Sequence, residues 1–222
     1  MPQTGFPMKS PVAKLGTIVT AALLVAGLAA CSPGSGAGGP VLPDTPLVDL
    51  MPSQTEVVDE MGPEWSQVSG ASSYSVVSLT FPVEADQFGK ACADATIALH
   101  SEINASIQET AQMGLRAGDS NTEIWRVLRA KSPDAATAFL KRVKESVDAC
   151  MDRPSARESV VETELKNAFA YETSLENSVQ VIEVYVLSGD LVIWTFSLES
   201  IQVAEQMAQL QLDKIAELVK KG

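Results

Sequence analysis

Histidine and cysteine are scarce in this sequence, which has one histidine, His100, and three cysteines among its 222 residues. Structural zinc sites are usually built from four Cys or His ligands, so we expect no metal site. A Ser-His-Asp hydrolase would have to use His100, and no motif such as Gly-x-Ser-x-Gly lies near it. We therefore predict no catalytic residue and no cofactor, and an exported hydrolase stays one hypothesis among three.

Basic residues are also few: 16 Lys and Arg stand against 28 Asp and Glu, which gives a formal net charge of −12. So acidic a surface repels phosphate groups, and we expect neither nucleic acid nor anionic lipid headgroups as partners. The first thirty residues are the exception, because their only charged side chains are Lys9 and Lys14.

The amino-terminal segment has the organisation of a bacterial export signal. Lys9 and Lys14 precede an apolar or small stretch, Leu15–Leu28, which is shorter than the roughly 20 residues of a membrane-spanning helix. The sequence Leu28-Ala29-Ala30-Cys31 then resembles the lipobox of bacterial lipoproteins. The resemblance implies a signal peptide over residues 1–30 and a lipid such as palmitate on Cys31. An ordinary secretory signal or an uncleaved anchor are the alternatives.

A Gly/Ser-rich stretch, 32–39, follows Cys31, and Pro40, Pro43 and Pro46 continue it. Such a composition is typical of a flexible and then extended linker. Its GSGAGG run lacks the Lys-Ser/Thr ending of a phosphate-binding loop. We therefore predict a tether over residues 31–62 and a single globular domain over residues 63–222.

The two remaining cysteines, Cys92 and Cys150, form an even pair in an exported domain, which favours a disulfide. Two buried free thiols are one alternative. A redox pair is the other, although the chain has no Cys-x-x-Cys motif.

Both cysteines lie on helical patterns, one predicted over Asp86–Gln112 and one over Pro133–Cys150. Ser132 is a suitable N-cap for the second helix, and a third helix is predicted over Ile201–Lys220. A Cys92–Cys150 bridge is easiest between antiparallel helices, whereas a single strand between them would make them parallel. A long connecting segment over 114–121 that reverses the chain direction is one way to reconcile antiparallel helices with a single strand between them.

Alternating and β-branched stretches predict five strands, of which the last two form a hairpin around Gly189-Asp190. These are Ser73–Val83, Thr122–Ala130, Asn167–Ser174, Ser178–Leu187 and Leu191–Leu198. The predicted order is β-α-β-α-β-β-β-α, which indicates an α+β fold with a largely antiparallel sheet and interspersed helices.

The predicted hairpin has two apolar faces, although a sheet covered on one side should have one polar face. One face collects Ile182, Val184, Val186, Ile193 and Thr195. The other face collects the candidate ligand-binding residues Glu183, Tyr185, Trp194 and Phe196. The alternative is that the last helix covers Tyr185, Trp194 and Phe196 as core.

Over roughly residues 65–220 the pattern is similar to the PknH-like extracellular sensor domain of mycobacterial kinases and actinobacterial lipoproteins. The residues that carry the resemblance are Cys92, Cys150, Ala135-Ala136 with Phe139, and Gly189-Asp190. The chain departs from that family in three ways. It has no Trp shortly before Cys150, no cysteines for a second disulfide, and Leu187-Ser188-Gly189-Asp190 in place of Arg-x-Gly-Asn. The resemblance implies a ligand-binding cleft and no catalysis.

The sequence thus favours a lipid-anchored, sensor-like binding domain on the extracytoplasmic face of the cell membrane. Its partners would be the membrane, through Cys31, and an envelope ligand or protein. An envelope lipoprotein that binds other proteins or serves a structural role, without a small ligand, is the main alternative.

Overall fold

The computed structural model describes residues 42, 44–73, 83, 85–119, 122–151, 156–175 and 180–221. Cys31, the signal segment and the predicted strand beyond Ser73 lie outside these residues, apart from Val83. The described elements are α1 (Leu47–Leu50), α2 (Gln54–Met61), β1 (Trp65–Ser73), α3 (Ala85–Phe88), α4 (Lys90–Ser106), β2 (Ile107–Ala117), β3 (Glu123–Ala130), α5 (Pro133–Cys150), β4 (Ala156–Val161), β5 (Ala168–Leu175), β6 (Gln180–Ser188), β7 (Leu191–Ser197) and α6 (Ile201–Lys221).

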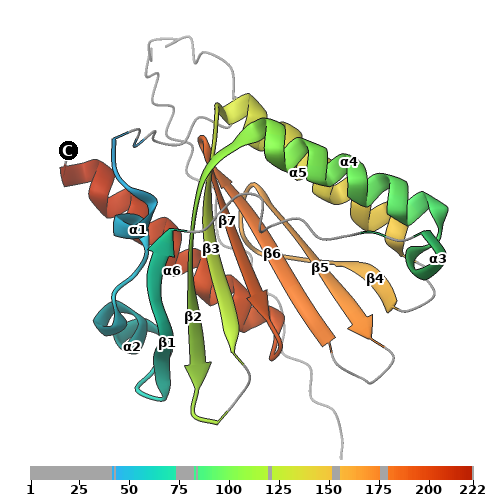
Figure 1. Cartoon of the computed structure of the whole chain (residues 1–222). Helices are drawn as coiled ribbons and strands as arrows, with labels where there is room; N and C mark the ends of the chain where they lie inside the picture. Colours follow the sequence, from blue (N-terminus) through green and yellow to red (C-terminus); the bar gives the residue numbers. More distant parts are fainter. Residues whose placement is uncertain are drawn as a thin grey trace, which may run out of the picture. The chain divides into compact units, whose positions relative to one another are not determined.

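The strands form one open antiparallel sheet in the order β1-β2-β3-β7-β6-β5-β4 (Figure 1). Strands that follow one another in the chain are hydrogen-bonded partners within each of two groups, β1-β2-β3 and β4-β5-β6-β7. The pairing of β3 with β7 joins the two groups. The predicted α+β class is confirmed.

Helices cover both faces of this sheet. Val186 of β6 belongs to the same buried cluster as Met207 of α6, whereas its neighbour Tyr185 belongs to a cluster with Phe139 of α5. Because successive side chains of a strand point to opposite faces, α6 and α5 lie on opposite sides of the sheet. In Figure 1 α6 passes behind the strands, and α4 and α5 lie side by side.

The helix α5 forms where its capping signals predict it. The Ser132 side chain accepts a hydrogen bond from the backbone N–H of Ala135, and Pro133 occupies the first turn, where its missing N–H costs nothing. The buried residues of α5 follow helical spacing along one stripe and include Ala136, Phe139, Leu140, Val143, Val147 and Cys150.

The first predicted helix, Asp86–Gln112, is interrupted near its start and extends too far at its end. Gly89, with φ 75°, separates α3 from α4, and α4 ends at Ser106. From Ile107 onward the chain is the strand β2, paired with β3. Ile107 lies four residues after Ile103 and so continues the helical spacing, but it also opens an alternating run with Ala111, Met113 and Leu115 that suits a strand.

The strand β2 explains why the two long helices α4 and α5 run antiparallel. A β2–β3 hairpin, and not a single strand, connects α4 to α5, so the helices run antiparallel. Cys92 at the start of α4 is bonded to Cys150 at the end of α5, with Cα atoms 4.6 Å apart. The predicted disulfide is therefore present in the structure.

The folded part of the described chain begins before residue 63, inside the segment expected to be a tether. Leu47 and Leu50 of α1 and Val57 of α2 are fully buried, in the same cluster as Met207 of α6. The buried Gln211 of α6 also donates to the Leu50 carbonyl at 2.6 Å. None of the helices in the described part of the chain has the length and apolar character that crossing a membrane requires.

The hairpin of β6 and β7 has the predicted register. Tyr185 pairs with Trp194 and Val186 with Ile193, across a turn in which Gly189 has φ 65°. The sorting of side chains into two faces is confirmed as well: Val184, Val186 and Ile193 lie on the α6 side, and Tyr185 and Val192 lie on the α5 side. Both faces are apolar because helices cover both.

A buried carboxylate, Glu123, lies at the β3–β7 seam and has no exposed surface. Its Oε2 accepts a hydrogen bond from the Leu198 backbone N–H at 2.9 Å. Burial raises the pKa of Glu123, the Leu198 N–H opposes this shift, and the nearby charge of Glu199 adds to it. The seam is therefore more stable when this carboxyl is protonated.

The variant Glu123→Gln should reveal this carboxyl in the pH dependence of stability. A raised pKa contributes stability that is present below the ordinary value of 4.5 and is lost as the pH rises through the folded-state pKa. Relative to the variant, the wild type should therefore become less stable as the pH rises above about 4.5 in urea titrations. The exposed Glu162→Gln is the matched control, and a pH-independent difference for Glu123→Gln would contradict the assignment.

Candidate ligand-binding site

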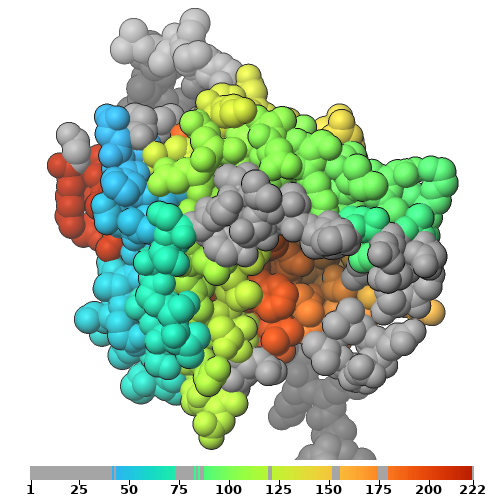
Figure 2. Space-filling view, viewed as in Figure 1, coloured from blue at the N-terminus to red at the C-terminus, as the bar shows by residue number. Residues whose placement is uncertain are grey.

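A cavity of about 200 Å³ lies between the α4–α5 pair and the sheet face formed by β4, β5, β6 and β7. Figure 2 shows the surface of β6 and β7, in orange, recessed below the green surface of α4. The lining residues are Phe88, Thr96, Leu99, His100, Ile103, Phe139, Val143, Ser146, Val147, Cys150, Glu158, Tyr171, Thr173, Glu183, Tyr185 and Trp194. The disulfide at Cys150 ties together the two helices that form one wall.

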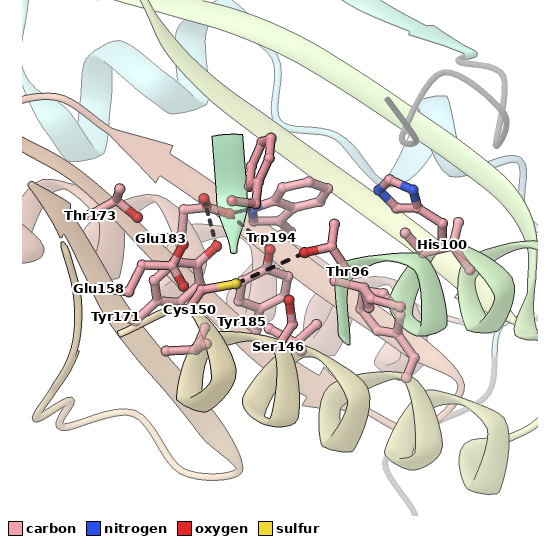
Figure 3. A pocket seen from close by; sticks show the side chains of 16 residues that line it. Thr96, His100, Ser146, Cys150, Glu158, Tyr171, Thr173, Glu183, Tyr185 and Trp194 are labelled. Atoms are coloured by element: carbon pink, nitrogen blue, oxygen red, sulfur yellow. Dashed lines mark hydrogen bonds between the residues drawn. The ribbon is translucent and has the colours of Figure 1, made fainter. Parts of the chain in front are cut away.

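The polar centre of the cavity is the carboxylate of Glu183. Its Oε1 accepts a hydrogen bond from the Tyr171 hydroxyl at 2.7 Å, and its Oε2 accepts from the Tyr185 hydroxyl at 2.8 Å and from Trp194 Nε1 at 2.7 Å. These residues converge from β5, β6 and β7 (Figure 3). Three donors on one carboxylate hold it in a fixed position and offset the cost of its partial burial.

The aromatic rings around Glu183 are stacked across the strands. The centroids of Tyr185 and Trp194 lie 5.2 Å apart with an interplanar angle of 19°, and Tyr171 lies 6.3 Å from Tyr185 at 11°. The guanidinium of Arg126 lies over Trp194, 4.3 Å from its centroid. Arg126, Trp194 and Tyr185 are directly paired across β3, β7 and β6, so the stack follows from the register.

Both tyrosine hydroxyls remain protonated at neutral pH. Burial raises the pKa of Tyr171 and of Tyr185 well above the ordinary value of 10.0, and the negative charge of Glu183 raises it further. The two phenols are therefore hydrogen-bond donors to Glu183 at any physiological pH.

The charged groups of the cavity wall are mostly acidic. Of the described residues that line it, Glu158 and Glu183 are carboxylates and none is lysine or arginine. Burial lowers the pKa of His100 below its ordinary value of 6.5, so this imidazole is neutral at pH 7. In the part of the chain that the structure describes, no group of three or more His, Cys, Asp or Glu side chains could hold a metal ion.

The structure brings together three of the four residues proposed from the sequence. Glu183, Tyr185 and Trp194 line the cavity, whereas Phe196, which pairs with Glu183 across the hairpin, is not among its lining residues. The alternative that the last helix covers these aromatics is wrong for Tyr185 and Trp194. Tyr185 and Trp194 pack in the cluster of α5, and α6 covers the opposite face.

Several lining residues were not predicted, above all Tyr171, Glu158 and His100. Tyr171 pairs with Glu183 in the β5–β6 register, and the sequence analysis found no turn motif that would fix that register. Glu158 belongs to β4, a strand the sequence analysis did not recognise. His100 lines the cavity from α4, and Figure 3 places it away from Glu183 and Ser146.

The fold and its cavity define a class of domain: one antiparallel sheet between helices, with a pocket under a disulfide-linked helix pair. No model of a known protein family matches the chain, and no curated protein matches it significantly. Solved structures similar in fold include the extracellular domain of PknH from Mycobacterium tuberculosis, with TM-score 0.42 and 11% identity, covering 78% of this chain and 94% of that chain.

A second similar structure is a putative uncharacterized protein, an Rv0999 ortholog, from Mycobacterium smegmatis. Its TM-score is 0.47 and its identity 11%, and the match covers 80% of this chain and 98% of that chain. The PknH-like resemblance that the sequence suggested is thus found again in the comparison of folds. What the chain binds has to be argued from its own cavity.

Proposed function

We propose that this chain is a lipid-anchored, extracytoplasmic binding domain of an actinobacterial cell envelope that takes a small ligand without transforming it. The observation that supports this most is the cavity of about 200 Å³ with the carboxylate Glu183 held by three donors in its wall. Ligand sites are typically concave and largely apolar, with a few well-placed polar groups, and this cavity has that character.

The walls of the cavity also suit a preformed site. The disulfide fixes the start of α4 against the end of α5, and the sheet wall is held by strand pairing on both sides of β6. A preformed site loses little conformational entropy when a ligand enters. Sensing would then depend on occupancy of this cavity.

Fluorescence of Trp194 tests this function directly. Trp194 lines the cavity, whereas Trp65 and Trp125 are buried in the cluster on the α6 side. Titration of the purified chain with fractionated cell-envelope extract should change the emission of the wild type. The change should persist in Trp65→Phe and disappear in Trp194→Phe. If no fraction alters the emission, a protein-binding or structural envelope lipoprotein becomes the better description.

The anchor is tested at Cys31. Cells given a palmitate analogue should label the wild-type chain and retain it in the membrane fraction. The variant Cys31→Ala should lose the label, because an acyl chain on this sulfur is part of what holds the protein to the bilayer. The variant Cys92→Ala is the matched control and should keep the label. Equal labelling of both variants would contradict the lipobox assignment.

A further inference from the structure

A row of directly paired residues crosses the sheet on the face that carries the cavity. Gln112 of β2 pairs with Arg126 of β3, and Arg126 pairs with Trp194 of β7. Trp194 in turn pairs with Tyr185 of β6. Directly paired residues of neighbouring antiparallel strands point to the same face of a sheet, so these four side chains follow one another across it. The row therefore connects the cavity residues Trp194 and Tyr185 with β2 and β3, which contribute none of the described lining residues.

Arg126 contacts both of its neighbours in this row. Its guanidinium lies over the ring of Trp194, 4.3 Å from the centroid, and its Nε donates a hydrogen bond to Gln112 Oε1 at 3.1 Å. A guanidinium at this distance is attracted electrostatically by the negative face of an indole ring. The hydrogen bond to Gln112 helps to hold the guanidinium above that face.

The ring of Trp194 is held by interactions from both neighbouring strands. Arg126 approaches it from β3, and the Tyr185 ring stacks against it from β6 with the centroids 5.2 Å apart. Its Nε1–H donates to Glu183 Oε2 at 2.7 Å. Hydrogen bonds weaken steeply as the donor angle departs from linearity. The interactions that fix the orientation of the ring therefore also maintain its bond to Glu183.

Opposite charges lie at two sides of this indole. The cation of Arg126 is over the ring, and the carboxylate of Glu183 accepts the proton of Nε1. Polar interactions that are linked in this way polarise one another, especially where water is partly excluded. The positive charge of Arg126 therefore makes Trp194 Nε1–H a stronger donor to Glu183.

Building on the proposed function, we infer that Arg126 is a positioning residue of the cavity. Through the ring of Trp194 it maintains the Nε1–H bond to Glu183, and so it fixes the polar cluster that a ligand meets. Arg126 is not among the described lining residues, and its effect on binding is transmitted by Trp194.

Hydrogen exchange at the indole Nε1–H of Trp194 tests this role in the ligand-free protein. Nitrogen-15 NMR separates the indole signals of Trp65, Trp125 and Trp194, and the variant Trp194→Phe identifies the last of them. The variant Arg126→Met keeps a long side chain without the charge. It should shift the Trp194 signal upfield and accelerate its exchange by about fivefold or more. Arg126→Lys keeps the charge and should restore part of the wild-type rate. The exposed Arg116→Met, also on the sheet, is the matched control and should change the rate by less than about twofold.

Unchanged exchange at Trp194 in Arg126→Met would overturn the inference. Equal acceleration at Trp65 and Trp125 would overturn it too, because that result reports a general loss of stability. A lysine variant that exchanges as fast as the methionine variant would reduce the role of Arg126 to packing, and would also contradict the inference. Gln112→Leu should accelerate exchange in the wild-type background and add nothing in Arg126→Met, whereas additive effects would show that Gln112 does not act through Arg126 and would count against the inference.

Binding is measured separately, with the cell-envelope fraction that changes Trp194 emission in the wild type as the probe. Half-saturation for Arg126→Met should need about fivefold more of this fraction, and Arg116→Met should behave as the wild type. Equal half-saturation in Arg126→Met would overturn the inference and leave the cavity a binding site. If no fraction changes the wild-type emission, the proposed function fails, and the exchange rates still decide whether Arg126 positions Trp194.

Discussion

Replacing Cys92 and Cys150 with alanine should lower the free energy of unfolding by about 4 kcal/mol. The two cysteines are 58 residues apart in sequence, and a bridge across a loop of that length removes much of the freedom of the unfolded chain. Urea titration of the double variant against the wild type measures the loss. We expect the largest stability change of any described here.

The wild type itself provides the control for this prediction. With a reductant its stability should fall to that of the double variant, and the reductant should leave the double variant unchanged. A loss below about 1 kcal/mol would mean that the unfolded chain is already compact between Cys92 and Cys150, so that the bridge restricts it little. The double variant should also bind cavity ligands more weakly, because α4 and α5 are no longer covalently joined.

Replacing Glu183 with leucine should cost about 3 kcal/mol of stability, because Tyr171, Tyr185 and Trp194 all lose their acceptor. Each of the single variants Tyr171→Phe and Tyr185→Phe removes one donor and leaves the other two bonds intact. These variants should cost about 1 kcal/mol each. The carboxylate is thus expected to contribute more to stability than either phenol alone.

A double-mutant cycle provides the stricter version of this test. In a Tyr185→Phe background, Glu183→Leu leaves one fewer donor unpaired, so it should cost less than in the wild type. Strict additivity would show that Tyr185 and Glu183 do not interact energetically. A cost of Glu183→Leu no greater than that of Tyr171→Phe would show that water in the cavity replaces the carboxylate.

The elements that could be predicted from the sequence have local signals. Ser132 and Pro133 fix the start of α5, and Gly189-Asp190 sets the β6–β7 register, which in turn sorts the side chains of both strands. The segment around Ile107 was predicted as helix, but its apolar residues fit both the helical spacing and the two-residue alternation of a strand. Pairing with β3, a tertiary contact, decides in favour of the strand.

The short helix α2 did have a readable signal that the sequence analysis did not use. Ser53 and Glu56 form a reciprocal capping box, with Glu56 accepting from the Ser53 N–H at 2.7 Å and Ser53 accepting from the Glu56 N–H at 3.3 Å. The prolines of the preceding segment favoured a linker assignment over this pattern. The Ser-x-x-Glu motif before apolar residues thus predicts the start of α2 in spite of the neighbouring prolines.

The candidate site was predictable only as far as one hairpin extends. Glu183, Tyr185 and Trp194 lie on one face of β6 and β7, and two-residue alternation is enough to group them. Tyr171, Glu158 and His100 come from three other elements. Their positions in the cavity wall depend on the β4–β5–β6 register and on the placement of α4, and no local sequence pattern specifies either of these.

The β3–β7 seam couples occupancy of the cavity to the integrity of the whole sheet. The helix α4 lies between β1 and β2 in the chain, whereas Glu183 and Trp194 belong to the other strand group, so the cavity exists only when the two groups have joined. Val127 and Ile193, paired at this seam, are 66 positions apart (193 minus 127). Closing so long a loop costs conformational entropy and slows folding. A molecule bound in the cavity would bind only the joined sheet, and it would therefore stabilise both strand groups together.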